Sequence, residues 1–185
     1  VVTGGLGAGL ARKETDDPEG VHLRMRRNLE RWLDAAPRLE CDWEPLNATY
    51  RRSLVDLAAL RFSPVTAGGR SLPAAGLPWF MTMFGRDSIF TSLQALPFTP
   101  ELAASTLQAL GDWQGSRVDD FRDEDPGRIL HEMRYGEMTA FEARPHSPYF
   151  GSVDATPLYV VLLDEYERWT GDTKLVRALE QQARA

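Results

Sequence analysis

An arginine and an aspartate stand side by side at Arg86 and Asp87, between the largely apolar residues 79–84 and a second apolar run. A carboxylate accepts two hydrogen bonds from hydroxyl groups, and a guanidinium donates several in one plane. This chemistry suits a ligand that carries many hydroxyl groups. The alternative is a helix start, with Asp87 or Ser88 as the N-cap and Arg86 in solvent. The apolar residues 79–84 directly before the pair argue against a fully solvated arginine.

Two later segments carry further groups of this kind. Residues 126–137, PGRILHEMRYGE, contain Glu132 and Arg134. They form no zinc motif, because the second histidine of HExxH is absent. Residues 149–157, YFGSVDATP, contain Asp154 directly before an apolar stretch. Asp154 is either a plain helix N-cap or part of a site.

Helices must position these residues, since no segment shows the alternation of a strand. The spacing of apolar residues and the capping signals predict helices over residues 21–35, 47–62, 87–96, 99–114, 154–170 and 172–185. Asn47 and Thr99 are the expected N-caps of their helices, and Gly171 ends the fifth. The sequence therefore predicts an all-α fold, with long irregular loops over residues 63–78 and 115–151.

The two most apolar helices, 87–96 and 154–170, are expected to be inner helices with more polar neighbours outside them. Each begins with an aspartate. If both belong to one toroid of helices, their N-termini lie at the same end. Asp87 and Asp154 would then face a common funnel.

Composition limits the possible partners. The chain has 185 residues and a formal net charge of −6, which disfavours nucleic acid and anionic membranes as partners and fits a neutral substrate. No apolar run is long enough to span a membrane. A single cysteine, Cys41, rules out a disulfide within the chain and points to a reducing compartment, hence to the cytoplasm.

Three segments together resemble a known family. They are PWFMTMFGRDSIF at 78–90, PGRILHEMRYGEM at 126–138 and PYFGSVDATPLYVVLLDEYERWTGD at 148–172. They look like segments of bacterial amylo-α-1,6-glucosidases and glycogen-debranching enzymes, in the same order. The resemblance implies about the first half of an (α/α)6 barrel over residues 21–185. It makes residues 1–20 a linker or the tail of a preceding domain.

The resemblance also implies roles for single residues. Arg86 and Asp87 would hold hydroxyl groups of the sugar in the −1 subsite, and Arg134 would border the same pocket. Asp154 would be the general acid that protonates the leaving oxygen. An N-cap lowers the pKa of a carboxyl group, whereas a general acid needs it raised. Glu132 is therefore kept as the second candidate for the acid.

The expected site also needs aromatic residues that contact the sugar and a second carboxylate that acts as the general base. Trp79 and Tyr149 could stack on a sugar ring, or they could pack in the core and brace a loop. The family places its general base far downstream, so we expect it beyond Ala185. The chain by itself would then be an incomplete and inactive fragment. Hydrolysis of this kind uses carboxyl groups and water, so no metal or organic cofactor is implied.

Two other functions stay open. The chain could be a non-catalytic α/α module that binds carbohydrate or a protein partner. It could also belong to another α/α-toroid glycosidase, of the mannosylglycerate or trehalose type. The expected ligand of the preferred interpretation is an α-glucan or an oligosaccharide.

Overall fold

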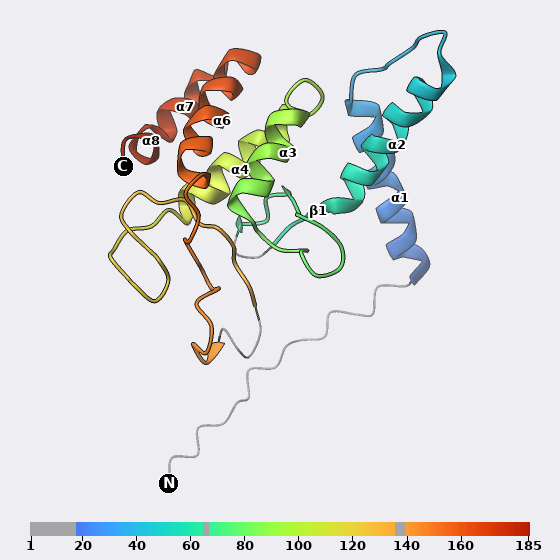
Figure 1. The fold of residues 1–185 in the computed structure, drawn as a ribbon. Coiled ribbons are helices and arrows are strands. Elements are labelled where there is room, and N and C mark those ends of the chain that lie inside the picture. Colours follow the sequence, from blue (N-terminus) through green and yellow to red (C-terminus); the bar gives the residue numbers. More distant parts are fainter. Residues whose placement is uncertain (1–17, 65–66, 136–139) are drawn as a thin grey trace.

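The computed structural model describes residues 18–64, 67–135 and 140–185. Helices dominate this part of the chain, as the sequence predicts (Figure 1). The elements, in chain order, are α1 (Pro18–Ala35), α2 (Glu44–Leu60), β1 (Arg61–Phe62), β2 (Leu72–Pro73), α3 (Gly85–Ala95), α4 (Pro100–Asp112), α6 (Ala155–Thr170), α7 (Thr173–Ala178) and α8 (Glu180–Arg184).

Helices α3, α4 and α6 pack against one another and enclose the core. Ile89, Leu107, Tyr159 and Leu162 are fully buried there. The buried residues of α6 recur every three or four positions, which is the pattern of a helix with one apolar face. The segments that precede α3 and α6 gather at one end of these helices (Figure 1).

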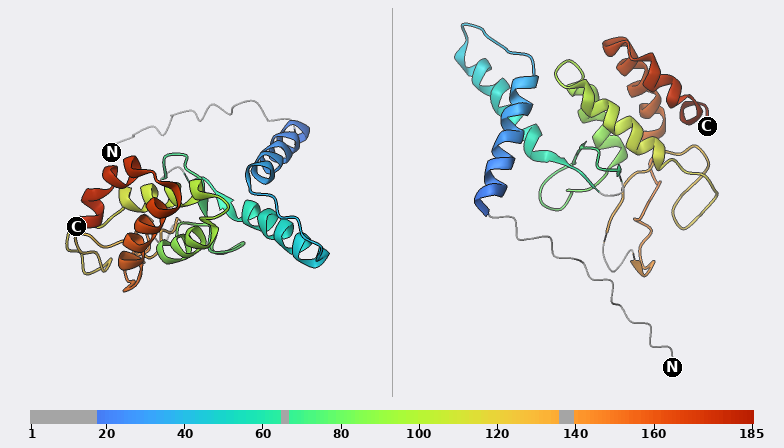
Figure 2. Two further views of the ribbon diagram at one scale, coloured as in Figure 1. Left: turned by 90° about the horizontal axis from the view of Figure 1, so that it is seen from above. Right: turned by 180° about the vertical axis from the view of Figure 1, so that it is seen from behind.

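Helices α1 and α2 form a hairpin that stands to one side of this body (Figures 1 and 2). Within the hairpin, Trp32 Nε1 donates a hydrogen bond to the Leu54 carbonyl, 3.1 Å away. The guanidinium carbon of Arg61 lies 3.8 Å from the centre of the Trp32 ring. The rings of Tyr50 and Phe98, 5.6 Å apart, connect the hairpin to the turn after α3.

The predicted starts of the first two helices are wrong. α2 begins at Glu44 and not at Asn47, because Pro45 occupies the first turn, where a missing N–H costs nothing. Asn47 is a residue of the helix, and its side-chain amide pairs with the backbone of Cys41. α1 begins at Pro18, earlier than predicted, and residues 1–17 lie outside the described residues.

The expectation of no strand also fails in one place. Arg61 and Phe62, predicted to end a helix, form β1 and pair antiparallel with Leu72 and Pro73. The predicted helix over 172–185 is in fact two short helices separated at Leu179.

The boundary signals of the later helices are confirmed in position. Thr99 stands at the N-cap position of α4, with Pro100 in the first turn, but its side chain forms no cap hydrogen bond. Gly171 ends α6 in the left-handed region, at φ 68°. The Asp172 carboxylate then accepts hydrogen bonds from the backbone N–H groups of Lys174 and Leu175 and caps α7.

Candidate carboxylate and arginine site

Helix α3 begins one residue before Arg86, at Gly85. The Gly85 N–H donates a hydrogen bond of 2.9 Å to the His131 carbonyl. A Cβ atom on Gly85 would lie 2.0 Å from the Leu130 carbonyl oxygen, so only glycine allows this approach. The tight contact fixes the start of the helix and places Arg86 and Asp87 in its first turn.

Asp87 is therefore not the N-cap of α3, and neither is Ser88. The N-cap position belongs to Phe84, whose side chain forms no cap hydrogen bond. The Asp87 side chain is half-buried in the first turn, where the positive end of the helix favours a carboxylate.

Three extended segments lie side by side next to this helix start. Met133 N donates to the Met83 carbonyl at 3.0 Å, and Tyr149 N donates to the Glu132 carbonyl at 3.0 Å. Glu132 forms antiparallel bridges with Phe84 on one side and with Tyr149 on the other. The segment containing Glu132 thus holds together the approaches to α3 and α6, which the sequence presents as irregular loops.

Asp154 directly precedes α6, as predicted, but its carboxylate does not cap the helix. The Ser152 hydroxyl oxygen instead accepts a hydrogen bond from Ala155 N at 3.3 Å. The same hydroxyl donates to Asp154 Oδ1 at 2.7 Å. Arg86 Nη1 lies 3.4 Å from Asp154 Oδ2. Two motifs that are 68 residues apart therefore meet at the N-termini of α3 and α6.

These neighbours set the charge of Asp154. The hydrogen bond from Ser152, and after it the hydrogen bond and charge of Arg86, lower the pKa of the Asp154 carboxyl group, while partial burial opposes them. Without a ligand, Asp154 is therefore ionised at neutral pH.

Glu132 lies deeper, with 11% of its side chain exposed. Arg134 Nε donates a hydrogen bond to Glu132 Oε2 at 2.8 Å, and His146 Nδ1 lies 2.7 Å from Oε1. Arg134 also donates from Nη1 to the Trp79 carbonyl at 2.6 Å. Both oxygens of Glu132 thus have basic partners, and the cluster links three separate segments.

The aromatic candidates differ in exposure. The Trp79 side chain is largely exposed, with a relative accessibility of 77%. Tyr149 is half-buried, and the edges of its ring meet the rings of His131 and His146 at centroid distances of 6.0 and 5.4 Å. The Asp123 carboxylate accepts a hydrogen bond from the Tyr149 hydroxyl, which, with burial, raises the pKa of Tyr149. Phe84 is buried, so it belongs to the packing and offers no face to a ligand.

Sequence reasoning missed two residues of this region, Ser152 and His146. Ser152 lies two positions before Asp154, and a serine shortly before a helix is a capping signal that could have found it. His146 has no comparable signal, because its partner Glu132 lies far away in the sequence. Glu137 of the predicted segment 126–137 lies outside the described residues.

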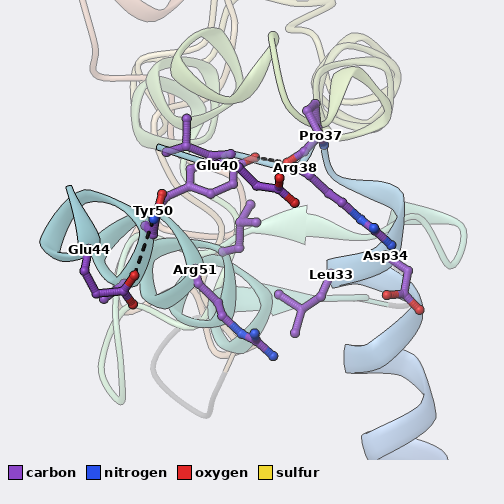
Figure 3. A pocket seen from close by; sticks show the side chains of 12 residues that line it. Leu33, Asp34, Pro37, Arg38, Glu40, Glu44, Tyr50 and Arg51 are labelled. Atoms are coloured by element: carbon purple, nitrogen blue, oxygen red, sulfur yellow. Dashed lines mark hydrogen bonds between the residues drawn. The ribbon is translucent and has the colours of Figure 1, made fainter. Parts of the chain in front are cut away.

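A hollow of about 470 Å³ lies elsewhere, on the α1–α2 hairpin (Figure 3). Leu33, Pro37 and Tyr50 are among the residues that line it, together with charged side chains such as Arg38 and Glu40. It is lined by none of the candidate site residues Arg86, Asp87, Glu132, Arg134, Asp154, Trp79 and Tyr149. The hollow therefore carries no argument about the carboxylate and arginine site.

No protein-family model matches the chain, and no curated protein matches it. Among the described residues, no three His, Cys, Asp or Glu side chains come together in a way that could hold a metal ion. The helices described here include none that is both long enough and apolar enough to cross a membrane.

Proposed function

We propose that this chain is part of the catalytic domain of an (α/α)6 glycoside hydrolase that acts on α-1,6 branch linkages of glycogen or a related α-glucan. The main support is the meeting of Arg86 and Asp154 at 3.4 Å, since both residues come from the motifs that resemble the family. Their side chains are 47% and 40% exposed, so a ligand can reach both. The helices α3, α4 and α6 would be the first inner and outer helices of the barrel.

In this proposal Arg86 and Asp87 bind hydroxyl groups of one sugar ring. Within the described part of the chain, no hydrogen bond or ion pair occupies the Asp87 carboxylate, so both of its oxygens are available as acceptors. Arg86 contributes donors. The pair thus offers both kinds of partner that a sugar hydroxyl needs.

Asp154 is the proton donor in this proposal, although its pKa is lowered when no ligand is bound. When a sugar hydroxyl binds the guanidinium of Arg86, Asp154 loses one of the interactions that lower its pKa. Burial of Asp154 under the sugar also raises its pKa and favours the neutral acid. Asp154 then passes its proton to the glycosidic oxygen as the bond from that oxygen to the anomeric carbon breaks. Water adds to the anomeric carbon, and a second carboxylate takes the proton of that water.

Glu132 is the weaker candidate for the acid. Its two oxygens already face Arg134 and His146, so neither is turned to a leaving group. We assign it a positioning role, because it holds Arg134 and through it the backbone of Trp79.

A backbone-amide NMR titration with isomaltose and maltotriose tests the proposal. We expect shifts centred on Arg86, Asp87 and Asp154, and we expect Arg86→Ala to weaken binding. Absence of shifts in this region, or shifts confined to the hollow on the α1–α2 hairpin, would overturn the proposal. The same titration with Asp154→Asn, followed by a hydrolysis assay of the natural gene product that contains this sequence, separates the enzyme from a binding module. A module would bind glucan with or without Asp154 and would hydrolyse none.

A further inference from the structure

The aspartate before α6 does not cap that helix with its side chain, so its carboxylate is available to a ligand. Asp154 has φ −106° and ψ −24°, a helical conformation, whereas a residue that caps with its side chain ordinarily has an extended backbone. Its backbone carbonyl accepts a hydrogen bond of 3.0 Å from Leu158 N. The side chain of Ser152 caps the helix in its place.

The Ser152 hydroxyl group lies between the helix and the carboxylate and contacts both. Its oxygen accepts a hydrogen bond from Ala155 N at 3.3 Å, and its hydrogen is donated to Asp154 Oδ1 at 2.7 Å. A hydroxyl group has only one hydrogen to donate. Any rotation of this group gives up one of the two contacts, in a place where Ser152 is half-buried and Ala155 is buried. The hydroxyl hydrogen therefore has a fixed direction, toward the carboxylate.

The two oxygens of the Asp154 carboxylate are consequently not equivalent. Oδ1 accepts the hydrogen of Ser152, so a proton placed on Oδ1 would point at another hydrogen. Oδ2 lies 3.4 Å from Arg86 Nη1, a longer contact, with a side chain that is 47% exposed. When a ligand hydroxyl group binds the guanidinium of Arg86, Oδ2 is the oxygen on which Asp154 can take up a proton.

We propose that Ser152 is a positioning residue that directs the acidic proton of Asp154 to Oδ2, the oxygen that faces the ligand. This inference rests on the proposed function. The proton leaves Oδ2 for the glycosidic oxygen as that oxygen takes the electron pair of its bond to the anomeric carbon. Oδ1 keeps the hydrogen bond from Ser152, which stabilises the carboxylate that remains after this step. Ser152 itself neither gives up nor gains a proton.

Removal of the Ser152 hydroxyl group has two separate consequences for Asp154. Oδ1 is no longer held, so the carboxyl group can rotate and carry its proton on either oxygen. The pKa of Asp154 also rises, because the hydrogen bond from Ser152 is the largest of the influences that lower it. The alkaline limb of kcat/KM reports the pKa of the acid in the free enzyme, so this limb moves to higher pH.

The test measures hydrolysis of panose by the natural gene product that contains this sequence, over a series of pH values. The variants are Ser152→Ala, Ser152→Cys, which keeps the size of the side chain, and Ser152→Thr, which keeps the hydroxyl group. Thr170→Ala is the matched control, at the other end of α6. The Thr170 hydroxyl group also donates to one neighbour, the Tyr166 carbonyl at 2.6 Å, and accepts from a backbone N–H, that of Asp172 at 3.1 Å.

We expect Ser152→Ala and Ser152→Cys to lower kcat about tenfold or more at the pH of highest activity, because the proton is no longer directed to the ligand. We expect KM to stay nearly unchanged and the alkaline limb of kcat/KM to move to higher pH. Ser152→Thr should restore both properties, and Thr170→Ala should change neither.

Two kinds of result would contradict this inference, and they are distinguishable. An unchanged kcat or an unmoved alkaline limb in the folded Ser152→Ala or Ser152→Cys variant would overturn the positioning role and leave the proposed function standing. The same changes in Thr170→Ala would do so too, because they would then reflect the stability of α6 alone. Failure of the wild type to hydrolyse panose would overturn the proposed function and this inference together.

Discussion

Arg86 Nη1 lies 3.4 Å from Asp154 Oδ2 across the adjacent N-termini of α3 and α6. Glycine is required at the start of α3 because a Cβ atom on Gly85 would lie 2.0 Å from the Leu130 carbonyl oxygen, whereas the Cβ of Ala155 in α6, 3.5 Å away, would be in ordinary contact. The contact therefore depends on backbone packing that the first turn of α3 determines. It gives Asp154 a cationic neighbour that a sugar hydroxyl could replace.

The first prediction concerns the charge of Asp154. Ser152 and Arg86 both lower its pKa, and Ser152 has the larger effect. We expect Ser152→Ala to raise the pKa of Asp154 toward its ordinary value, and Arg86→Gln to raise it by a smaller amount. Carboxyl carbon NMR during a pH titration measures both shifts. Asp172 is the internal control, because its pKa is lowered by its own neighbours, first the backbone N–H of Leu175.

This shift has a consequence for stability with a definite sign. The pKa of Asp154 is lower in the folded chain than in the unfolded chain, so its ionised form stabilises the fold at pH values above the unfolded pKa. That contribution is lost as the pH falls through the folded pKa. Ser152→Ala should therefore lose less stability than the wild type on acidification. An equal or greater loss, measured by urea unfolding at a series of acid pH values, would contradict the assignment.

The second prediction concerns Gly85. A methyl group there would overlap the Leu130 carbonyl, a backbone atom that cannot move alone. We expect Gly85→Ala to lower the free energy of unfolding by about 3 kcal/mol. Gly76→Ala is the control, since its added Cβ would meet nothing closer than 3.8 Å. Urea unfolding of the two variants checks this, and equal stabilities would rule out the close approach.

The third prediction concerns Glu132. Glu132→Ala leaves Arg134 and His146 without their carboxylate partner in a partly buried position. We expect a loss of about 3 kcal/mol in the free energy of unfolding, at the low end for a buried pair because the two basic side chains are a third exposed.

Glu142→Ala provides the matched control for that change. Glu142 also pairs with an arginine, Arg122, but its side chain is 69% exposed. Its removal should cost less than about 1 kcal/mol. If both variants were equally stable, Glu132 would not hold the three segments together.

The fold was predictable where local signals determine it. Thr99 and Pro100 mark the start of α4, and Gly171 and Asp172 mark the boundary between α6 and α7, because capping depends on neighbours in the sequence. The pairing of β1 with β2, and the bridges on both sides of Glu132, depend on residues far apart in the chain. Periodicity carries no information about such pairings, so the loops looked irregular.

The candidate site was predictable in outline and not in detail. The pattern predicted two apolar helices with a common end, where Asp87 and Asp154 would face a common funnel. The contact that the structure shows at this end is between Arg86 and Asp154. The actual cap, Ser152, and the partner of Glu132, His146, depend on side-chain geometry. The sequence suggested that capping of the helix would lower the pKa of Asp154, which opposes a role as general acid. In the structure the pKa is lowered, but by the hydrogen bonds from Ser152 and Arg86.

The most direct test of the proposed function is hydrolysis with and without Asp154. The natural gene product that contains this sequence is incubated with panose, which carries one α-1,6 linkage, and glucose release is followed over time. We expect the wild type to release glucose and Asp154→Asn to be slower by about a hundredfold or more, as for loss of a general acid, with panose affinity retained. Undiminished hydrolysis by Asp154→Asn, or no hydrolysis by the wild type, would contradict the assignment of Asp154 as the acid of a glycosidase.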